Sequence, residues 1–254
     1  MTPAQFQLHA KIEDSHWWFV GRRYIIQSLV DSLFRSKHDK ILIDMGCGTG
    51  GNLSTFRGEF DCTGIDLSSD AILLAKKRFP TINFICGGLE EEACVCIEKA
   101  DVVLLLDVLE HIRNDMGFLF DLVGRLKKGS HLLITVPAEM ALWSPHDDFH
   151  GHFRRYSKND LFDMLIALPV SIRLLSYYNI WLYPAVKIIR SFTNLTGKAW
   201  GKAETDLSVP PKFINTILSL IFSSESRWLI NRIDQHCVTK LPFGVSLIAL
   251  VRKE

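Results

Sequence analysis

Short, continuously apolar runs alternate with segments of helical periodicity through the first half of the chain. Such runs are typical of parallel strands that are covered on both faces, and the segments between them repeat apolar residues at helical intervals. The strands predicted in this way are KILIDMG (40–46), DCTGID (61–66), TINFICGG (81–88), DVVLLLD (101–107) and SHLLITVPA (130–138). Strands that alternate with helices predict an α/β fold with a doubly wound parallel sheet.

The same pattern supplies the remaining elements. Helices are expected at residues 1–38, 51–58, 68–79, 115–129 and 157–168. Residues 171–179 predict a sixth strand and residues 243–253 a closing strand. We therefore expect one domain over residues 1–254, divided into a helical lid (1–38), a core (40–180), a helical insertion (181–238) and the final strand (240–253).

The composition is that of an ordered globular protein. The 254 residues are 48% hydrophobic and 22% charged, with a net charge of +1. This balance indicates no polyanionic partner, so a nucleic-acid ligand is not expected. The amino-terminal residues lack a basic stretch followed by an apolar one, which makes the cytoplasm the expected location. The six cysteines lack paired CxxC spacing and are expected to be free thiols.

The segment before the final strand combines apolar and basic residues. No run reaches the ~20 apolar residues that span a bilayer, and the best candidate, residues 177–192, is interrupted by Pro184, Lys187 and Arg190. Residues 181–235 are interpreted as a helical cap between the sixth and seventh strands. The alternative is a peripheral contact with the inner face of a membrane, or a surface that holds a lipid tail.

A glycine-rich turn follows the first predicted strand. Gly46, Gly48 and Gly51 in DMGCGTGGN match the spacing of a dinucleotide fingerprint, in which backbone N–H groups receive a pyrophosphate. Asp44 stands two residues earlier, where its carboxylate would repel phosphates and favour a cationic ligand. S-adenosylmethionine carries an ammonium and a sulfonium group and no phosphate, so this cofactor is expected. Asp66, at the end of the second strand, can accept both ribose hydroxyls in either cofactor class.

The ordered set DMGCGTGGN, GIDLS, DVVLLLDVLEHI and LKKGSHLLITVPA resembles the motifs of class I S-adenosylmethionine-dependent methyltransferases over residues 40–137. The resemblance implies a Rossmann-like, seven-stranded sheet whose last strand is antiparallel. It also implies that Asp44 lies near the cofactor's amino group and that Asp66 holds its ribose. The implied cofactor-binding residues are Asp44, Gly46, Gly48, Gly50, Asp66, Leu67, Leu89 and Asp107.

The chain departs from this family after the third strand. Family members often have a Gly-Asp pair there, whose carboxylate contacts the adenine amine, whereas this chain has Gly87-Gly88-Leu89. The adenine contact is therefore expected from the backbone or from Glu90.

The expected activity is transfer of a methyl group to oxygen on a small-molecule, lipid-linked or glycan acceptor. Three alternatives stay open: an NAD-type oxidoreductase, a turn without a ligand, and a non-catalytic partner subunit that keeps the fold. Asp44 argues against the first, and the glycine loop with both Asp44 and Asp66 argues against the other two.

Two segments outside the shared core are expected at the acceptor. Residues 13–26, EDSHWWFVGRRYII, predict a lid over the cofactor; the alternative is tryptophans packed on the sheet beside solvated arginines. Residues 142–157, LWSPHDDFHGHFRRYS, follow the fifth strand at the edge where doubly wound folds bind ligands. Both resemble segments of bacterial methyltransferases associated with cell-surface glycans, lipids or quinone-like compounds. The predicted substrate-binding residues, whose arginines would bind an anionic group, are Trp143, Arg154, Arg155 and Tyr156.

Histidines are the expected acid–base groups. A hydroxyl acceptor loses a proton during methylation, and imidazole titrates near neutral pH. The catalytic candidates are His111, in DVLEHI after the fourth strand, and His146 and His152 in the later loop. His111 has the alternative role of a polar helix-start residue in the pocket wall. No metal is expected, and the alternative to that view is a site formed by His146, His150 and His152.

Overall fold

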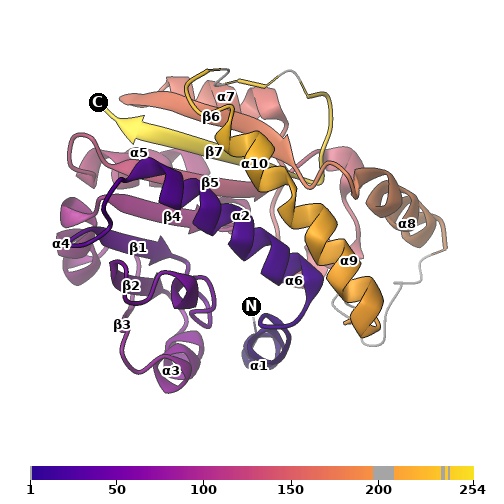
Figure 1. Ribbon diagram of the computed structural model, residues 1–254, viewed down its shortest axis with the longest axis horizontal. Coiled ribbons are helices and arrows are strands. Elements are labelled where there is room, and N and C mark those ends of the chain that lie inside the picture. The colour runs from indigo at the N-terminus through magenta and orange to yellow at the C-terminus, as the bar shows by residue number, and fades with distance from the viewer. Residues whose placement is uncertain (1, 197–208, 236–237, 240) are drawn as a thin grey trace.

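A seven-stranded sheet with helices on both faces forms the centre of the computed structural model, which describes residues 2–196, 209–235, 238–239 and 241–254 (Figure 1). The strand order is β3-β2-β1-β4-β5-β7-β6, and β7 runs antiparallel to both of its neighbours. This arrangement confirms the predicted fold class. The strands are β1 (Ile41–Met45), β2 (Asp61–Asp66), β3 (Asn83–Cys86), β4 (Val102–Leu106), β5 (His131–Pro137), β6 (Val170–Tyr178) and β7 (Ser246–Lys253).

The central strand β4 shows why its sequence is continuously apolar. Val103 and Leu105 face one hydrophobic cluster, and the alternate residues of the strand face a second cluster on the other side of the sheet. All five residues of β4 are buried. A strand that is covered on both faces has no solvent side on which a polar residue would be favoured.

Helices cover the two faces of the sheet in separate groups. The first cluster includes side chains of α4, α5 and α7, and the second includes side chains of α2, α3, α9 and α10. In Figure 1, α2, α9 and α10 lie in front of the sheet. The helices on the core are α3 (Ser69–Arg78), α4 (Glu91–Lys99), α5 (Asp115–Arg125) and α7 (Lys158–Ile166), and a short α6 (Pro145–His150) follows the 3₁₀ turn η3 (Met140–Leu142).

The amino-terminal residues form two helices, α1 (Pro3–Ile12) and α2 (Trp17–Leu33), where the sequence predicted one helical region. His16 ends the break between them, because its extended backbone and its ring, which accepts from the Trp18 N–H, cap the start of α2. Glu13 in the break accepts a hydrogen bond from Thr49 Oγ1 at 2.9 Å and pairs with Arg78 on α3. The break thus ties both amino-terminal helices to the glycine loop.

Two local predictions were incomplete. The helix predicted at residues 51–58 is wrong, since only a 3₁₀ turn, η1 (Leu53–Thr55), forms there. The chain turns back toward β2 soon afterwards through Gly58, whose φ of +86° is incompatible with a continuing helix. The pattern also gave no element for α4, although Ala93, Cys94 and Ile97 recur at helical spacing and are buried.

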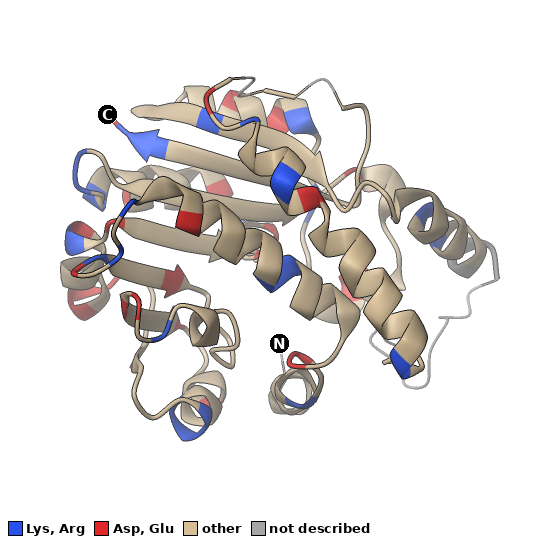
Figure 2. Ribbon diagram, viewed as in Figure 1, with Lys and Arg blue, Asp and Glu red and all other residues tan. Residues whose placement is uncertain are grey.

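The predicted insertion at 181–238 is helical in its described part, which forms α8 (Tyr183–Thr196), α9 (Lys212–Ser223) and α10 (Glu225–Ile230). Residues 197–208, 236 and Cys237 lie outside the described residues. Helix α9 carries one charged residue, Lys212 at its first position, whereas charges of both signs are spread over the other elements (Figure 2). Glu225 fixes the start of the insertion by accepting from the backbone N–H groups of Asn179 and Ile180.

We predict that Gly21 is required for the contact between α2 and α9. A Cβ added to Gly21 would lie 2.7 Å from Cδ1 of the fully buried Phe222, so Gly21→Ala should lower the free energy of unfolding by about 1–3 kcal/mol. Gly124→Ala on α5 is the matched control: its Cβ meets no described atom within 4 Å, and it should change stability by no more than about 1 kcal/mol, in the stabilising direction. Urea denaturation measures both variants, and equal stabilities would contradict the described packing.

Candidate functional site

A cavity of about 500 Å³ opens at the carboxyl ends of β1 and β4, where the strand order reverses. The two amino-terminal helices, the glycine loop, α6, α8 and α9 contribute to its wall. Much of the described lining is apolar or aromatic: Phe6, Trp17, Trp18, Leu182, Val186 and Leu218. Such a cavity suits an organic ligand that is held by a few polar groups.

The glycine loop presents backbone toward this cavity. Gly46, Gly48 and Gly50 have φ values of +79°, +53° and +82°, a region in which a side chain is strained. A Cβ on Gly48 would meet no described atom within 4 Å, so the loop is open on that side. Asp66 holds the loop by accepting from the Gly48 N–H at 2.8 Å, and its other oxygen accepts from the Ser68 N–H.

Asp44 lies buried beneath the glycine loop. Its Oδ1 has no hydrogen-bond partner among the described residues, and its Oδ2 accepts only a long hydrogen bond of 3.5 Å from Asn52. Burial raises the pKa of Asp44 to about 7, although Arg22 and Asn52 act in the opposite direction. A buried carboxylate with an unpaired oxygen fits an ammonium group, which supports the predicted position of the cofactor's amino-acid part.

Asp107 directly follows β4 and has a φ of +56°, a left-handed conformation that is rare outside glycine. Its carboxylate pairs with Arg22 of α2 at 2.9 Å. Arg22 is buried and lies over the Trp18 ring at 4.9 Å, so the alternative of a solvated arginine is wrong at this position. The lid helix is therefore anchored to the end of the central strand.

The two predicted cofactor leucines lie outside the described lining of the cavity. Leu67 is exposed after β2, and Leu89 is partly buried against the core. Asp44, Gly50 and Asp66 are likewise absent from that described lining.

Asp147 on α6 holds together residues 144–155, the segment that follows β5, through its hydrogen bonds. It is fully buried and accepts two hydrogen bonds from Arg155, at 2.8 and 3.0 Å, and one from the backbone N–H of Ser144 at 2.9 Å. The Nδ1 atom of His152 lies 2.9 Å from Asp147 Oδ1. Burial acts to raise the pKa of Asp147, but His152 and Arg155 outweigh it and hold that pKa well below its usual range.

The structure separates the four predicted substrate residues. Arg155 reaches the cavity, although its guanidinium is paired with Asp147. Arg154 pairs with Asp115 at 2.9 Å, and Tyr156 donates to the same carboxylate at 2.7 Å. These two residues and Trp143 are not among the described residues of the cavity wall.

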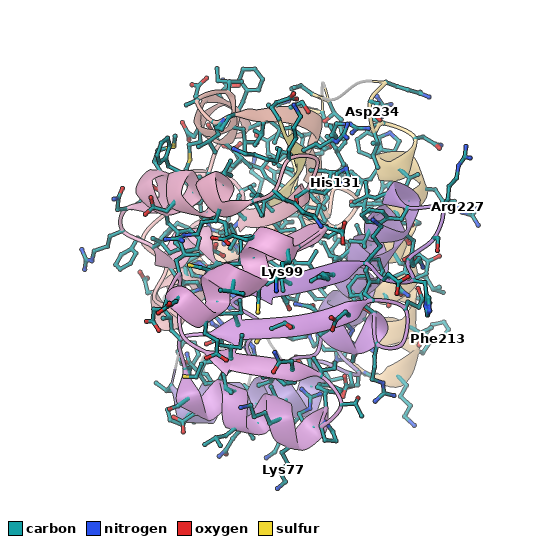
Figure 3. All side chains as sticks on the ribbon, turned by 90° about the vertical axis from the view of Figure 1, so that its left-hand side faces the viewer. Lys77, Lys99, His131, Phe213, Arg227 and Asp234 are labelled. Carbon is teal, nitrogen blue, oxygen red and sulfur yellow. The ribbon has the colours of Figure 1, made fainter. Side chains whose placement is uncertain are left out.

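All three histidines predicted as catalytic candidates line the cavity, together with three others: His9, His16 and His150. The ring centroids of His111 and His152 are 4.8 Å apart, and those of His146 and His150 are 4.4 Å apart. Burial lowers the pKa of His111 to about 4 and that of His150 to about 3. These imidazoles are therefore neutral near pH 7. His131, by contrast, begins β5 at the opposite end of the sheet (Figure 3).

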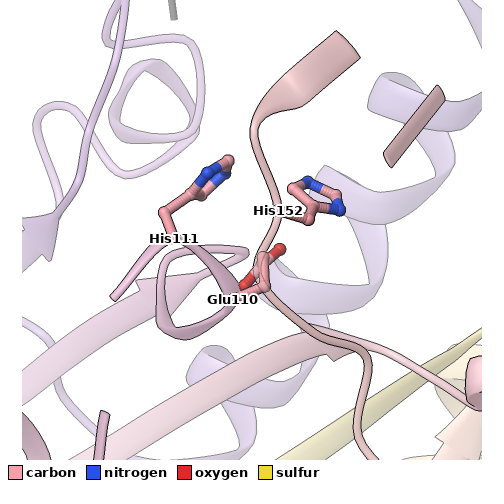
Figure 4. Close-up of side chains that lie close together, drawn as sticks. All are labelled: Glu110, His111 and His152. Atoms are coloured by element: carbon pink, nitrogen blue, oxygen red, sulfur yellow. The ribbon is translucent and has the colours of Figure 1, made fainter. Parts of the chain in front are cut away.

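Glu110 joins His111 and His152 in one group, in which a ligand atom from each residue lies within 4.8 Å of the others (Figure 4). We call this set the Glu110 group. Glu110 and His111 come from the 3₁₀ turn η2 (Leu109–His111), and His152 follows α6. Sequence reasoning selected both histidines but missed Glu110, although its place beside His111 directly after a buried strand was a usable signal. The group can accept a proton or hold a cation.

The chain is similar to known methyltransferases in sequence and in fold. The sequence model of a methyltransferase domain family matches residues 19–168. A protein of Rickettsia bellii named ubiquinone biosynthesis O-methyltransferase is 29% identical over 170 residues, which cover 59% of this chain and 68% of that protein. The mitochondrial ubiquinone biosynthesis O-methyltransferase of Schizosaccharomyces pombe is 33% identical over 103 residues, covering 38% and 37%.

Solved structures resemble the whole chain in fold. The plantazolicin methyltransferase BamL, in complex with a triazolic desmethylPZN analog and SAH, has a TM-score of 0.57 at 16% identity, and the match covers 98% of this chain and 89% of that chain. Geranyl diphosphate methyltransferase in complex with SAM has a TM-score of 0.51 at 12% identity, covering 91% and 85%. At these identities the likeness concerns the fold alone.

We predict that S-adenosylmethionine binds more tightly as the pH rises from about 5.5 to 8. Below its pKa of about 7, Asp44 is mostly protonated and must lose a proton to pair with the ammonium group, which weakens binding by up to ~10-fold per pH unit. Isothermal titration calorimetry against pH measures this dependence. Asp44→Asn should bind more weakly and lose the slope, and Asp70→Asn, at an exposed site on α3, should keep both. A slope that survives in Asp44→Asn would contradict the assignment.

We also predict that Asp147 is essential for stability. Asp147→Ala leaves the buried guanidinium of Arg155 without its partner, which should cost about 3–5 kcal/mol of unfolding free energy. The neighbouring Asp148 is exposed, so Asp148→Ala should stay within about 0.5 kcal/mol of the wild type. Chemical denaturation of both variants provides the comparison, and a small loss for Asp147→Ala would show that the ion pair does not hold this segment.

Proposed function

This chain belongs to the class I methyltransferases that use S-adenosylmethionine, and we propose that its acceptor is a hydroxyl group on a small ring that carries an apolar chain. Family membership makes the chain an enzyme and sets aside the oxidoreductase and non-catalytic alternatives. The observation that carries the proposal is the cavity, where an aromatic and aliphatic wall meets the Glu110 group at the carboxyl end of β4.

Different residues of the chain bind different parts of the cofactor. When bound, S-adenosylmethionine supplies an electrophilic methyl group, whose transfer to a hydroxyl oxygen leaves S-adenosylhomocysteine and a proton. In this proposal Asp44 and the glycine loop hold the amino-acid part by charge and backbone contact. The ribose is assigned to Asp66, as the family resemblance implies. The amino-terminal helices, with His16 and Trp17 in the cavity wall, exclude water from above.

An oxygen acceptor is supported by the acid–base groups of the cavity. Methylation of a hydroxyl releases a proton, and the Glu110 group offers a carboxylate beside two imidazoles, of which His111 is neutral near pH 7. The relatives from Rickettsia bellii and Schizosaccharomyces pombe are both named as O-methyltransferases. Both arguments favour oxygen over carbon or nitrogen as the methylated atom.

An apolar chain on the acceptor is supported by the insertion helices. Leu182, Val186 and Leu218 extend the cavity wall along α8 and α9 as an aliphatic surface. Phe213 on α9 is 77% exposed and stands at the periphery of the molecule (Figure 3). The membrane contact of residues 181–235, the alternative to a helical cap, is not tested by the structure. In the part of the chain that the structure describes, no helix combines the length and the apolar character needed to cross a bilayer.

The test is methyl transfer from labelled S-adenosylmethionine to cell extracts divided into a solvent-extracted lipid fraction and an aqueous fraction. We expect label in the lipid fraction, in a product that withstands mild alkali as an ether does and a methyl ester does not. Asp44→Asn should show no transfer at a cofactor concentration that saturates the wild type. Label confined to the aqueous fraction, or released by alkali, would overturn the proposed acceptor.

A matched pair of substitutions on α9 tests the path of the apolar chain. Leu218 lines the cavity, and Leu220 is 64% exposed on the same helix. Leu218→Asp should reduce transfer to the lipid acceptor by at least ~10-fold while S-adenosylmethionine still binds, because a carboxylate would replace apolar contact. Leu220→Asp should keep most of the activity. Equal activity of the two variants would place the acceptor elsewhere.

A further inference from the structure

Arg190 brings a positive charge to the part of the cavity wall that α8 forms. Leu182, Val186 and Arg190 are four residues apart, so they share one face of the helix, and all three line the cavity. At a rise of ~1.5 Å per residue, this wall changes from aliphatic to cationic over about 12 Å. The Arg190 side chain is 12% exposed, and its Nη1 donates to the carbonyl oxygen of Leu142 at 2.8 Å. The guanidinium is therefore fixed beside the turn η3.

Three imidazoles adjoin this guanidinium. Burial lowers the pKa of His146 well below its usual value, and His150 and Arg190 act in the same direction, which places the guanidinium near this ring. The ring centroids of His146 and His150 are 4.4 Å apart, and those of His150 and His9 are 5.8 Å apart. All four side chains line the cavity, from α1, α6 and α8. We call this set the Arg190 cluster: His9, His146, His150 and Arg190.

Two nitrogens of the cluster are buried without a hydrogen-bond partner among the described residues, Nε2 of His9 and Nε2 of His150. Burial lowers the pKa of His9 to about 4 and that of His150 to about 3, so both rings are neutral near pH 7. A neutral imidazole carries one N–H, which becomes a donor when it stands on the unpaired nitrogen. Buried donors without acceptors are unfavourable, so a ligand that supplies acceptor oxygens at this place is stabilised.

The charge balance around the cluster favours an anion. Asp147 lies 4.0 Å from Arg190 but also pairs with Arg155, so two guanidinium groups face one carboxylate. One positive charge therefore remains uncompensated among the described residues of α6, α8 and the segment between them. The described acidic residues of the cavity wall stand elsewhere, in the break between α1 and α2 and after β4: Glu13, Asp107 and Glu110.

We propose that the Arg190 cluster binds a phosphate group carried by the acceptor. The inference rests on the proposed function and adds an anionic group to the ring hydroxyl and the apolar chain. One guanidinium can satisfy both oxygens of a carboxylate, whereas the imidazole donors beside it call for a group with more oxygens, which a phosphate has. S-adenosylmethionine has no phosphate, so the cluster acts on the acceptor alone. A phosphate held at this end of the cavity fixes the orientation of the acceptor and hence the position of its hydroxyl.

The first experiment measures the site without the unknown acceptor. Inorganic phosphate is titrated by calorimetry into the full-length, chelator-treated protein saturated with S-adenosylhomocysteine, so that neither a stray metal ion nor the empty cofactor site holds the anion. Acetate serves as the carboxylate probe. We expect one phosphate per chain and weaker binding of acetate. Arg190→Gln and His150→Phe should each weaken phosphate binding by at least ~10-fold, because each removes a donor to the phosphate.

Lys187→Gln is the matched control, because Lys187 is exposed on the same helix and is not among the described residues of the cavity wall. It should leave phosphate binding unchanged, and all variants should bind S-adenosylhomocysteine as the wild type does, which shows that they are folded. Three results would overturn the site: no stoichiometric phosphate binding, binding that survives in Arg190→Gln, or an equal loss in Lys187→Gln. Acetate that binds as tightly as phosphate would overturn the assignment to phosphate.

The second experiment asks whether the phosphate belongs to the acceptor. The lipid fraction that receives labelled methyl groups is treated with phosphodiesterase and phosphatase, freed of both enzymes and assayed again. We expect transfer to fall by at least ~10-fold, and inorganic phosphate to inhibit transfer to the untreated fraction. Undiminished transfer after treatment would remove the phosphate from the acceptor and leave the proposed function standing. Phosphate binding by the cluster without transfer to any extract fraction would instead remove the proposed function and leave a site for free phosphate.

Discussion

The buried guanidinium of Arg22 lies near three carboxyl groups, those of Asp44, Asp107 and Glu110, at the carboxyl ends of β1 and β4. The ligand preference of the site depends on this excess of acidic over basic groups. Arg22 pairs with Asp107, and Asp44 and Glu110 are also close enough to raise its pKa against the effect of burial. A single positive charge cannot keep all three carboxyl groups ionised in a cavity that excludes water, and burial raises the pKa of both Asp44 and Glu110. A cationic ligand stabilises their ionised forms, which accounts for the preference for an ammonium and sulfonium cofactor over a pyrophosphate.

The acid–base character of the cavity follows from burial rather than from residue type alone. Histidines titrate near neutral pH in water, but in this cavity desolvation keeps His9, His111 and His150 uncharged. These uncharged imidazoles do not add to the positive charge of Arg22, so they do not oppose the binding of a cation. Asp147 is the exception among the buried groups, because Arg155 and His152 keep it ionised and make it a fixed support.

Sequence reasoning worked where a single local rule decides the structure. Continuous apolar runs identified the buried strands, and the position of Asp44 before the glycines indicated the charge of the ligand. Sequence reasoning failed where contacts between distant parts of the chain determine the structure. The burial of Arg22 depends on a partner on β4, and the cost of burying Glu110 becomes visible only when its surroundings are known. The length of the turn after β1 was likewise set by the return to β2, not by helix propensity.

The hydrogen bond between Glu13 and Thr49 connects the glycine loop to residues that lie outside the family match. The methyltransferase family model matches from residue 19, yet Glu13 bonds Thr49, and a side chain at Gly51 would collide with the Glu13 carboxylate, 2.5 Å from its position. Residues 13 and 51 are therefore constrained as a pair across that boundary. The boundary of the family model therefore crosses a contact of the cofactor loop, with Glu13 outside the matched residues and Thr49 and Gly51 inside them.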